Sequence, residues 1–352
     1  MKIIFDKAAN HLKQNLPFVI YKNPNEANVV GLFQKNDTLF LVNDFTEKGF
    51  VFASFDGNQT VLIPKNQSEI VKVAWDKNKL DIPEKVAALA NELDKNNFKN
   101  LVAKGIQAIE NHEFKKVVLS RKETVELVNF DLVSAFEKLT QLYPSAFVYC
   151  FFHPKVGIWL GATPEQLLRV KNNSFETIAL AGTQKEEVSK EVIWKIKEKE
   201  EQQFVTDYIV AKLQKVASEL SVSKPYSIKA GSIWHIKTDI SGIFNSESSM
   251  QEIVHLLHPT PAVCGFPKEK SKFFILENEN YKRTFYTGYL GELNSSFAED
   301  NANTNLFVNL RCMEICDSHV HLYMGCGITK DSIPQKEWEE SINKSATMRK
   351  IL

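Results

Sequence analysis

The stretch "WLGATPEQLL", Trp159 to Leu168, joins the end of an apolar segment to a polar Thr-Pro-Glu-Gln sequence. The apolar residues before it are typical of a strand in the core of a sheet. Thr163 is typical of a helix N-cap, Pro164 of the first helical position and Gln166 of a capping box, so the stretch predicts that a helix begins here. Glu165 would then place a carboxylate at the edge of a buried sheet. The helix dipole, which favours acidic residues in a first turn, is by itself enough to account for that position.

The composition of the 352-residue chain is that of a soluble globular protein, with 43% hydrophobic and 24% charged residues. Basic and acidic residues both number 43, and this zero net charge gives no electrostatic reason to expect nucleic acid or an anionic membrane as a partner. No apolar run approaches the roughly 18 residues of a membrane span. The first residues, MKIIFDKAANHLKQ, become polar too early for a signal peptide. Five cysteines, an odd number, favour reduced thiols, so we expect a cytoplasmic protein.

The first quarter of the chain differs in pattern from the rest. Short apolar runs separated by Asn, Asp and Gly turns predict a β-meander over residues 18–62. A helical pattern over 82–93 and a polar segment, 94–100, follow it. The polar segment is the best candidate boundary, so we divide the chain into a β-rich part, 1–96, and a larger region, 97–352.

The larger region alternates strands with few regular helices. A helical pattern covers 101–110, and two long helical patterns cover 190–220 and 334–351. Strands with few helices between them indicate a mostly antiparallel α+β architecture. The predicted strands are 116–119, 147–152, 175–181, 287–293, 306–315 and 319–324.

Carboxylates fall on the apolar face of the first long helix. Counting back from Tyr208 by three and four residues places Glu201 and then Glu198 on the apolar stripe. A buried glutamate is costly unless it is paired or binds a metal. The alternative is that the run KEKEEQQ, 197–203, is a solvated face, and the helix alone favours that alternative.

The C-terminal helix repeats this pattern. Pro334 marks its first turn, and Glu337, Glu340 and Lys344 fall on one face. Two helices that present carboxylates fit a hard cation such as Mg²⁺. The alternative is an exposed i, i+4 pair between Glu340 and Lys344, which is common in helices.

Other residues interrupt the apolar strand patterns. Gly325 and Gly327 flank a cysteine where a strand runs into a turn, so the backbone could approach a ligand there. Arg311 interrupts the apolar run 306–315 and is either exposed at an edge or forks onto a carboxylate. The alternative for Lys116 is an exposed lysine at the start of a strand, where it would serve solubility alone.

Metal sites of the zinc type are not predicted. His255 and His258 have no third ligand near them in the sequence. Cys312 and Cys316 share a strand face without a second pair, which disfavours zinc. The sequence has neither a Gly-x-Ser-x-Gly elbow nor a Walker loop.

Ten segments together resemble one known family, the chorismate-utilising enzymes, which includes isochorismate, salicylate, anthranilate and aminodeoxychorismate synthases. The resemblance covers roughly residues 97–350, and the order of the segments makes it specific. The segments are KVVLSR (116–121), TPEQLL (163–168), LAGT (180–183), EEQQFVTDYI (200–209), HIKTDISG (235–242), HPTPAVCGFPK (258–268), FYTGYLG (285–291), NLRCMEI (309–315), GCGIT (325–329) and EWEESINK (337–344).

The resemblance implies a single large α+β domain with two stacked, mostly antiparallel β-sheets flanked by helices, and an active site between them. It implies that Lys116 is the general base that activates water to attack C2 of chorismate. Glu165 is similar to the general acid that protonates the departing C4 hydroxyl. A helix N-terminus favours ionised Glu165, so burial would have to raise its pKa by more than the dipole lowers it.

The resemblance also implies the binding residues. Glu201 and Glu340 are similar to Mg²⁺ ligands, with Glu198 and Glu337 in supporting positions. Gln202 stands where relatives often have His, which leaves the local hydrogen bonding open. The implied substrate-binding residues are Gly182, Thr183, His235, Ala262, Tyr286, Arg311, Gly325, Gly327 and Lys344.

Three positions discriminate among the family's activities. Lys116 points to water as the nucleophile, Ala181 stands where aminodeoxychorismate enzymes have a lysine, and the segment 258–265 differs from that of salicylate synthases. We therefore expect a Mg²⁺-dependent isochorismate synthase that acts on chorismate, with no obligate protein partner, for menaquinone or catechol siderophore synthesis. The alternatives are a salicylate synthase and, more remotely, a non-catalytic chorismate-binding module.

Overall fold

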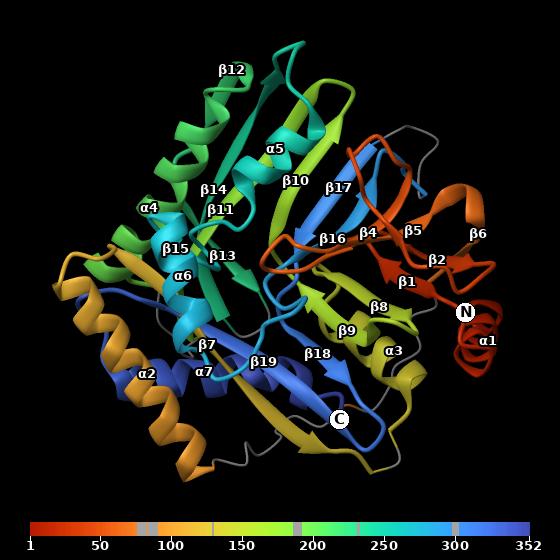
Figure 1. Cartoon of the computed structure of the whole chain (residues 1–352), viewed down its shortest axis with the longest axis horizontal. Helices are drawn as coiled ribbons and strands as arrows, with labels where there is room; N and C mark the ends of the chain where they lie inside the picture. The colour runs from red at the N-terminus through yellow and green to blue at the C-terminus, as the bar shows by residue number, and fades with distance from the viewer. Residues whose placement is uncertain (76–81, 83–90, 129, 186–191, 231–232, 298–302) are drawn as a thin grey trace.

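The structure is a computed structural model. It describes residues 1–75, 82, 91–128, 130–185, 192–230, 233–297 and 303–352. Within these residues the strands form two antiparallel sheets, with helices around them (Figure 1). The predicted α+β fold with two mostly antiparallel sheets is therefore confirmed.

The first sheet has nine strands in the order β15-β7-β19-β18-β9-β8-β1-β2-β6. Its central strands, β9 and β8, come from the middle of the chain, with the late strand β18 on one side and the early strand β1 on the other. In sheet order, the bounds are Gly265–Phe266, Lys116–Glu126, His319–Ile328, Cys312–Ile315, Gly157–Thr163, Phe147–His153, Phe18–Lys22, Asn28–Gln34 and Ser68–Ala74.

The second sheet follows the order β12-β14-β11-β10-β17-β16-β4-β5-β3, and β13 pairs with β14 beside this path. It too combines early and late strands. In sheet order, the bounds are Ala217–Val222, Ile233–Phe244, Ser174–Lys185, Gln166–Lys171, Asn303–Val308, Tyr289–Leu293, Gly49–Ala53, Thr60–Pro64 and Phe40–Leu41, and β13 is Tyr226–Ala230.

Helices cover the sheets and carry part of the site. Helices α2 and α7 pack on each other and on β7 and β19, while α4 packs on β11 and β14. None of the helices in the described ranges is long and apolar enough to span a membrane. The helix bounds are Lys2–Lys13 (α1), Glu92–Glu110 (α2), Leu132–Leu142 (α3), Ile196–Leu213 (α4), Met250–Leu257 (α5), Lys268–Asn278 (α6) and Pro334–Arg349 (α7), with a 3₁₀ turn at Lys65–Gln67.

The early strands belong to both sheets. β1, β2 and β6 lie in the first sheet and β3, β4 and β5 in the second, so the predicted meander over 18–62 is divided between two sheets. The polar segment 94–100, which the sequence offered as a boundary, lies inside the helix α2. Of the helical pattern over 82–93, residues 83–90 lie outside the described residues, and 92–93 belong to the start of α2.

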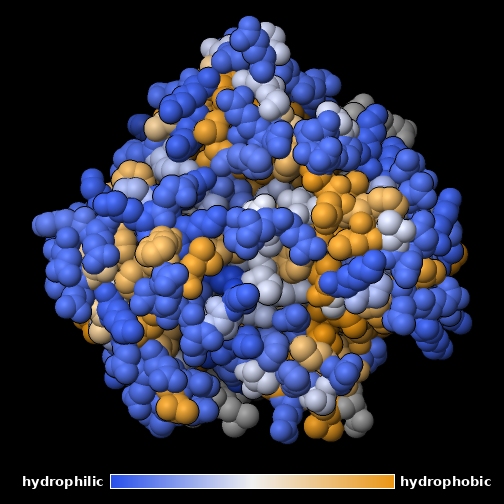
Figure 2. All heavy atoms as spheres, in the orientation of Figure 1, coloured by the Kyte–Doolittle hydropathy of each residue, from blue (hydrophilic) through white to orange (hydrophobic). Residues whose placement is uncertain are grey.

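Aromatic side chains fill the space between the sheets. Phe52 stacks on Phe285 with ring centroids 4.5 Å apart, and Phe147 stacks on Phe307 at 4.4 Å. The second pair joins β8 of the first sheet to β17 of the second, and buried aromatic pairs add to the free energy gained from apolar burial. The two sheets are thus held face to face by one apolar cluster. On the outer surface, Figure 2 shows mostly hydrophilic side chains, with a band of apolar atoms to the right of centre.

The stretch 159–168 does not begin a helix, so this prediction is wrong. β9 ends at Thr163, and β10 begins at Gln166 in the other sheet. Thr163 does use its hydroxyl locally, since the N–H of Glu165 donates to its Oγ1 at 3.3 Å. The same hydroxyl donates to the carbonyl oxygen of Val308 at 2.6 Å, and β10 then pairs with β17. Strand pairing has overridden the local capping pattern.

The predicted strand over 306–315 is also divided between the sheets. β17 ends at Val308 and β18 begins at Cys312, and Arg311 between them has a left-handed φ of 49°. Asn309 fixes this break, because its Oδ1 accepts a 2.6 Å hydrogen bond from Tyr149 and its amide donates to a backbone carbonyl. The two crossings from sheet to sheet lie side by side, since β10 pairs with β17 and β9 with β18.

The first long helical pattern, over 190–220, is too long. The helix α4 ends at Leu213, and residues 217–222 form β12, which pairs with β14. The helix over 334–351 is confirmed as α7.

Candidate active site

A pocket lies where the two crossings between the sheets meet α4 and α7. It brings together most of the catalytic, substrate-binding and metal-binding residues that the sequence predicted. Those that line it are Glu165, Gly182, Thr183, Glu201, His235, Ala262, Tyr286, Arg311, Gly325, Gly327 and Lys344. Lys116, Glu198, Glu337 and Glu340 stand behind this lining rather than on it.

Lys116 is fully buried at the start of β7, next to the pocket. Its Nζ lies 3.0 Å from Oε1 of Glu201 on α4. Gly327 makes room for this pair, because a Cβ at that position would collide with the Glu201 carboxylate and lie 3.3 Å from Cε of Lys116. Gly327 lies within β19, not in a turn after it as the sequence suggested. A side chain there would close the pocket.

Glu165 is buried in the segment that joins β9 to β10. Burial raises the pKa of its carboxyl group to about 8, although the positive charges of Lys116, Lys344 and Arg311 act in the opposite direction. Because no helix begins here, no helix dipole favours the ionised form. Glu165 is therefore mostly protonated at pH 7, and a protonated carboxyl can donate a proton.

Carboxylates from α7 gather behind Glu201. Oxygens of Glu337 and Glu340 and the Sγ of Cys326 lie within 4.8 Å of one another. Burial and the neighbouring charge of Glu340 raise the pKa of Glu337, and Lys197 lowers it. Each carboxylate has a lysine beside it, since Lys197 lies 2.5 Å from Glu337 and Lys344 lies 2.6 Å from Glu340.

Two of the carboxylates each have one oxygen that makes no hydrogen bond to the described residues. Oε2 of Glu198 and Oε2 of Glu337 are buried without a hydrogen-bond partner among the residues that the structure describes. Burial raises the pKa of the Cys326 thiol, so that it stays protonated and donates to the backbone oxygen of Glu337 at 3.2 Å. The group thus offers oxygen ligands, which a hard divalent cation prefers.

His235 presents a hydrogen-bond acceptor to the pocket. Its Nδ1 lies 2.9 Å from the carbonyl oxygen of Gly182 and must carry the proton, because a carbonyl only accepts. Burial lowers the pKa of His235 to about 3, so the ring is neutral and Nε2 has a free lone pair. No partner for Nε2 occurs in the described residues. Gly182 has a φ of +73° at a bulge in β11, and a Cβ there would lie 3.2 Å from Glu198.

The wall formed by β19 and its neighbours is cationic and aromatic. Lys344 donates to the backbone oxygen of Gly325 at 2.9 Å, and Arg311 lines the same pocket. Tyr286 stacks on Tyr323 at 5.3 Å. Two cations beside aromatic rings suit an anionic ligand with an apolar body.

Two residues at or beside the site, Tyr323 and Lys197, were not identified from the sequence. Tyr323 lines the pocket and falls on the same face of β19 as Gly325 and Gly327, so a period of two could have identified it. Lys197 lay within a run that was read as a solvated face. Gln202 does not face the carboxylates, since its amide donates to hydroxyl groups of Thr206 and Thr238, each at 2.8 Å.

Comparison with known proteins links this geometry to one family. Residues 48–352 match the family model described as "Chorismate binding enzyme". The isochorismate synthase EntC of Escherichia coli strain K12 is 30% identical over 266 residues. The match covers 72% of this chain and 66% of that protein, slightly under two thirds of its length.

Two solved structures resemble the whole chain in fold. One is a putative 2,3-dihydroxybenzoate-specific isochorismate synthase, DhbC, from Bacillus anthracis, with a TM-score of 0.79 and 22% identity, covering 98% of this chain and 99% of that one. The other is MenF, the menaquinone-specific isochorismate synthase from Escherichia coli, with a TM-score of 0.79 and 20% identity, covering 96% and 88%. Because the two sequences are only 22% and 20% identical to this chain, these structures establish a shared fold and nothing further.

Proposed function

The chain belongs to the family of chorismate-binding enzymes, and from this premise we propose that it is an isochorismate synthase, which interconverts chorismate and isochorismate. The observation that carries the proposal is the placement of a buried lysine, Lys116, and a buried glutamate, Glu165, at one pocket, the first behind its lining and the second on it. The reaction needs a base and an acid at the same time, and these two side chains can supply them.

The proposed reaction moves a hydroxyl group from C4 to C2 of the ring. Lys116, in its neutral form, takes a proton from the water that attacks C2. Glu165 gives its proton to the C4 hydroxyl, which leaves as water while the ring double bonds shift. Every atom is conserved, so the same groups act in reverse roles in the reverse direction. Nζ of Lys116 lies 3.0 Å from Oε1 of Glu201, so Glu201 would have to be engaged elsewhere for this nitrogen to approach the attacking water.

The substrate carries two carboxylates, and the pocket has two cations beside aromatic rings. Arg311 and Tyr286, with the backbone of Gly325 and Gly327, would bind the enolpyruvyl carboxylate. Lys344 would act near the ring carboxylate. Binding of both ends orients the ring between Lys116 and Glu165. The free lone pair on His235 is suited to accept a hydrogen bond from a ring hydroxyl.

The carboxylates of α4 and α7 would hold the magnesium ion. Glu201 and Glu340 are the proposed ligands, with Glu198 and Glu337 beside them, and the unpartnered oxygens of Glu198 and Glu337 support this assignment. When bound, Mg²⁺ would supply positive charge that holds the ring carboxylate. Lys197, Lys344 and Lys116 balance the carboxylate charges in the structure described here.

Removal of one metal-binding carboxylate should raise the magnesium requirement. We expect Glu201→Gln and Glu340→Gln to increase the Mg²⁺ concentration at half-maximal activity by at least about tenfold, because a neutral amide binds a hard cation weakly. Titration of activity with Mg²⁺ after chelator treatment measures this. Glu200→Gln, which changes an exposed neighbour on the same helix, should match the unmodified chain. Full activity after exhaustive chelation would contradict the metal assignment.

The reaction should stop at isochorismate. Salicylate formation needs a further hydrogen shift to the departing enolpyruvyl group, which requires a pocket shaped for that conformer. Ala262, in the segment 259–265, lines the pocket, and this segment differs from that of salicylate-forming relatives. We expect the same chorismate–isochorismate mixture from either side, with an equilibrium constant on the order of one and at most traces of salicylate.

Chromatography of the reaction on pure enzyme tests where it stops. Stoichiometric release of pyruvate without an added lyase would move the assignment to a salicylate synthase. Loss of both activities, with chorismate still bound, would favour a non-catalytic module.

A further inference from the structure

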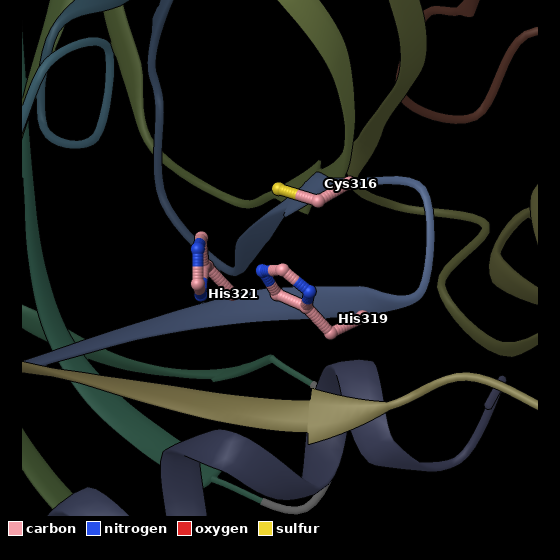
Figure 3. A group of neighbouring side chains, drawn as sticks. All are labelled: Cys316, His319 and His321. Atoms are coloured by element: carbon pink, nitrogen blue, oxygen red, sulfur yellow. The ribbon is translucent and has the colours of Figure 1, made fainter.

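A second cluster of metal-binding side chains lies at the end of the β18–β19 hairpin, away from the pocket lining. Cys316 follows β18, and its N–H donates to the carbonyl oxygen of His319 at 2.9 Å, which closes the turn. His319 and His321 are two residues apart on β19 and so share a face of the strand. Figure 3 shows the sulfur and both imidazole rings gathered on one side of the hairpin.

The ligand atoms of this cluster are close enough for one ion to reach all three. One atom from each of Cys316, His319 and His321 lies within 4.8 Å of the others. Zinc bonds of roughly 2.0–2.3 Å in a tetrahedral site separate neighbouring ligand atoms by roughly 3.3–3.8 Å. Ligand atoms that are 4.8 Å apart would have to approach each other by about 1 Å to reach the separation found in a zinc site. All three side chains are half-buried, so they have room to turn.

The surroundings orient the rings and leave a nitrogen for a metal. The hydroxyl of Thr124 lies 3.0 Å from Nδ1 of His321, and that of Ser318 lies 3.4 Å from Nδ1 of His319. A hydrogen bond to the ring nitrogen that does not bind the ion orients the imidazole ring of a metal-binding histidine. With Nδ1 engaged, the Nε2 atom of each ring is the one that would bind the ion.

The charges around the thiol also favour a cation. Glu314 and Asp317 flank Cys316 in the chain, and Lys122 lies on the neighbouring strand β7. Two carboxylates against one ammonium leave an excess of negative charge. Among these three side chains, the Lys122 ammonium opposes a metal ion.

We propose that Cys316, His319 and His321 form a binding site for a divalent transition metal of the zinc class, with water in the fourth position. One thiolate and two imidazoles suit zinc or cobalt and not magnesium. The thiol proton leaves to solvent when the metal–sulfur bond forms, so binding strengthens as the pH rises. The site is independent of the proposed function, because none of its members lines the pocket.

Cobalt provides a spectroscopic test, because a thiolate bound to Co²⁺ gives a charge-transfer absorption band. The reduced full chain, stripped with a chelator and kept in excess Mg²⁺, should bind one equivalent of Co²⁺ and show this band. Zn²⁺ should displace the cobalt and abolish the band. Cys316→Ser should remove the band, and His319→Asn and His321→Asn should each weaken cobalt binding by at least about tenfold. His112→Asn, at an exposed histidine elsewhere, should leave binding unchanged.

Several results would overturn the proposal. Absence of the band, or a band that persists in Cys316→Ser, would exclude Cys316 as a ligand. A band lost only in Cys326→Ala would place the thiolate at the carboxylate cluster instead. Equal cobalt affinity in His319→Asn and His112→Asn would show that the histidines do not contribute. Each variant's circular dichroism spectrum and melting temperature show whether it folds. If Cys316→Ser does not, the two histidine variants decide the matter.

Discussion

Replacement of Lys116 by glutamine is expected to lower kcat by about 10²–10⁴-fold, because it removes the proposed general base. Glutamine is a better test than alanine. Lys116 is fully buried and ion-paired with Glu201, and alanine would leave both a cavity and a carboxylate without its partner. Glutamine keeps most of the volume and can still donate a hydrogen bond to Glu201. Chorismate binding should therefore change little.

Three measurements separate a lost base from a damaged fold. Steady-state kinetics gives kcat, calorimetric titration gives chorismate affinity, and thermal unfolding gives the melting temperature. Lys115→Gln is a matched control, because Lys115 is the exposed neighbour of Lys116. If Lys116→Gln retained kcat within a few-fold of the unmodified chain, Lys116 could not be the base.

Replacement of Glu165 by glutamine should also lower kcat by about 10²–10⁴-fold, because glutamine cannot donate the proton that the departing hydroxyl needs. In the unmodified chain, kcat should follow the fraction of Glu165 that is protonated. Burial holds the pKa of Glu165 at about 8, so the protonated fraction falls as the pH passes 8. We expect kcat to decline above this pH. A kcat that rises steadily from pH 7 to 9.5 would be incompatible with Glu165 as the acid.

The same carboxyl should make stability depend on pH. The unfolded chain has the ordinary pKa of 4.5 for Glu165, and the folded chain about 8. Between these values the folded state binds more protons, so the contribution of Glu165 to the free energy of unfolding falls as the pH rises from 4.5 to 8. Glutamine resembles the protonated form and removes this loss, which is on the order of a few kcal/mol. Glu165→Gln should therefore melt higher than the unmodified chain at pH 9, and the difference should shrink towards pH 5.

A control at an exposed glutamate, Glu110→Gln, isolates this effect from the general loss of one charge. Its melting temperature should follow that of the unmodified chain across the pH range. A parallel change in both variants would mean that Glu165 is not specifically destabilising when ionised. The two Glu165 experiments together predict a variant that is inactive and more stable at high pH.

The local part of the fold could be predicted from the sequence, and the crossings between sheets could not. A strand such as β8 is marked by an apolar run that is complete within a few residues. The stretch around Thr163 carries a capping pattern that is equally local, yet strand pairing with β17 and the hydrogen bond to Val308 decide its structure. These partners are more than a hundred residues away in the sequence, beyond the range of any local pattern.

The site was predicted mainly through family resemblance, and most of its residues do meet at one pocket. Chemistry alone left Glu165, Arg311 and the helical carboxylates with ordinary explanations. Lys197 could not be found, because its partner Glu337 lies on another helix. The cluster at Cys316 was missed for a simpler reason. Counting cysteine pairs does not reveal histidines that a hairpin brings beside a thiol.

The alternation of the chain between two sheets has a consequence for how the protein is made. β1 pairs with β8 and β4 pairs with β16. These early strands cannot complete their pairing until the ribosome has synthesised partners that lie much later in the sequence. Pairings between such distant residues fold slowly, because long loops must close before the contacts form. A nascent chain that ends before β16 leaves β4 with an unpaired edge, and such edges promote aggregation. Expression yield should therefore be sensitive to translation speed and chaperones, and truncated fragments should be insoluble.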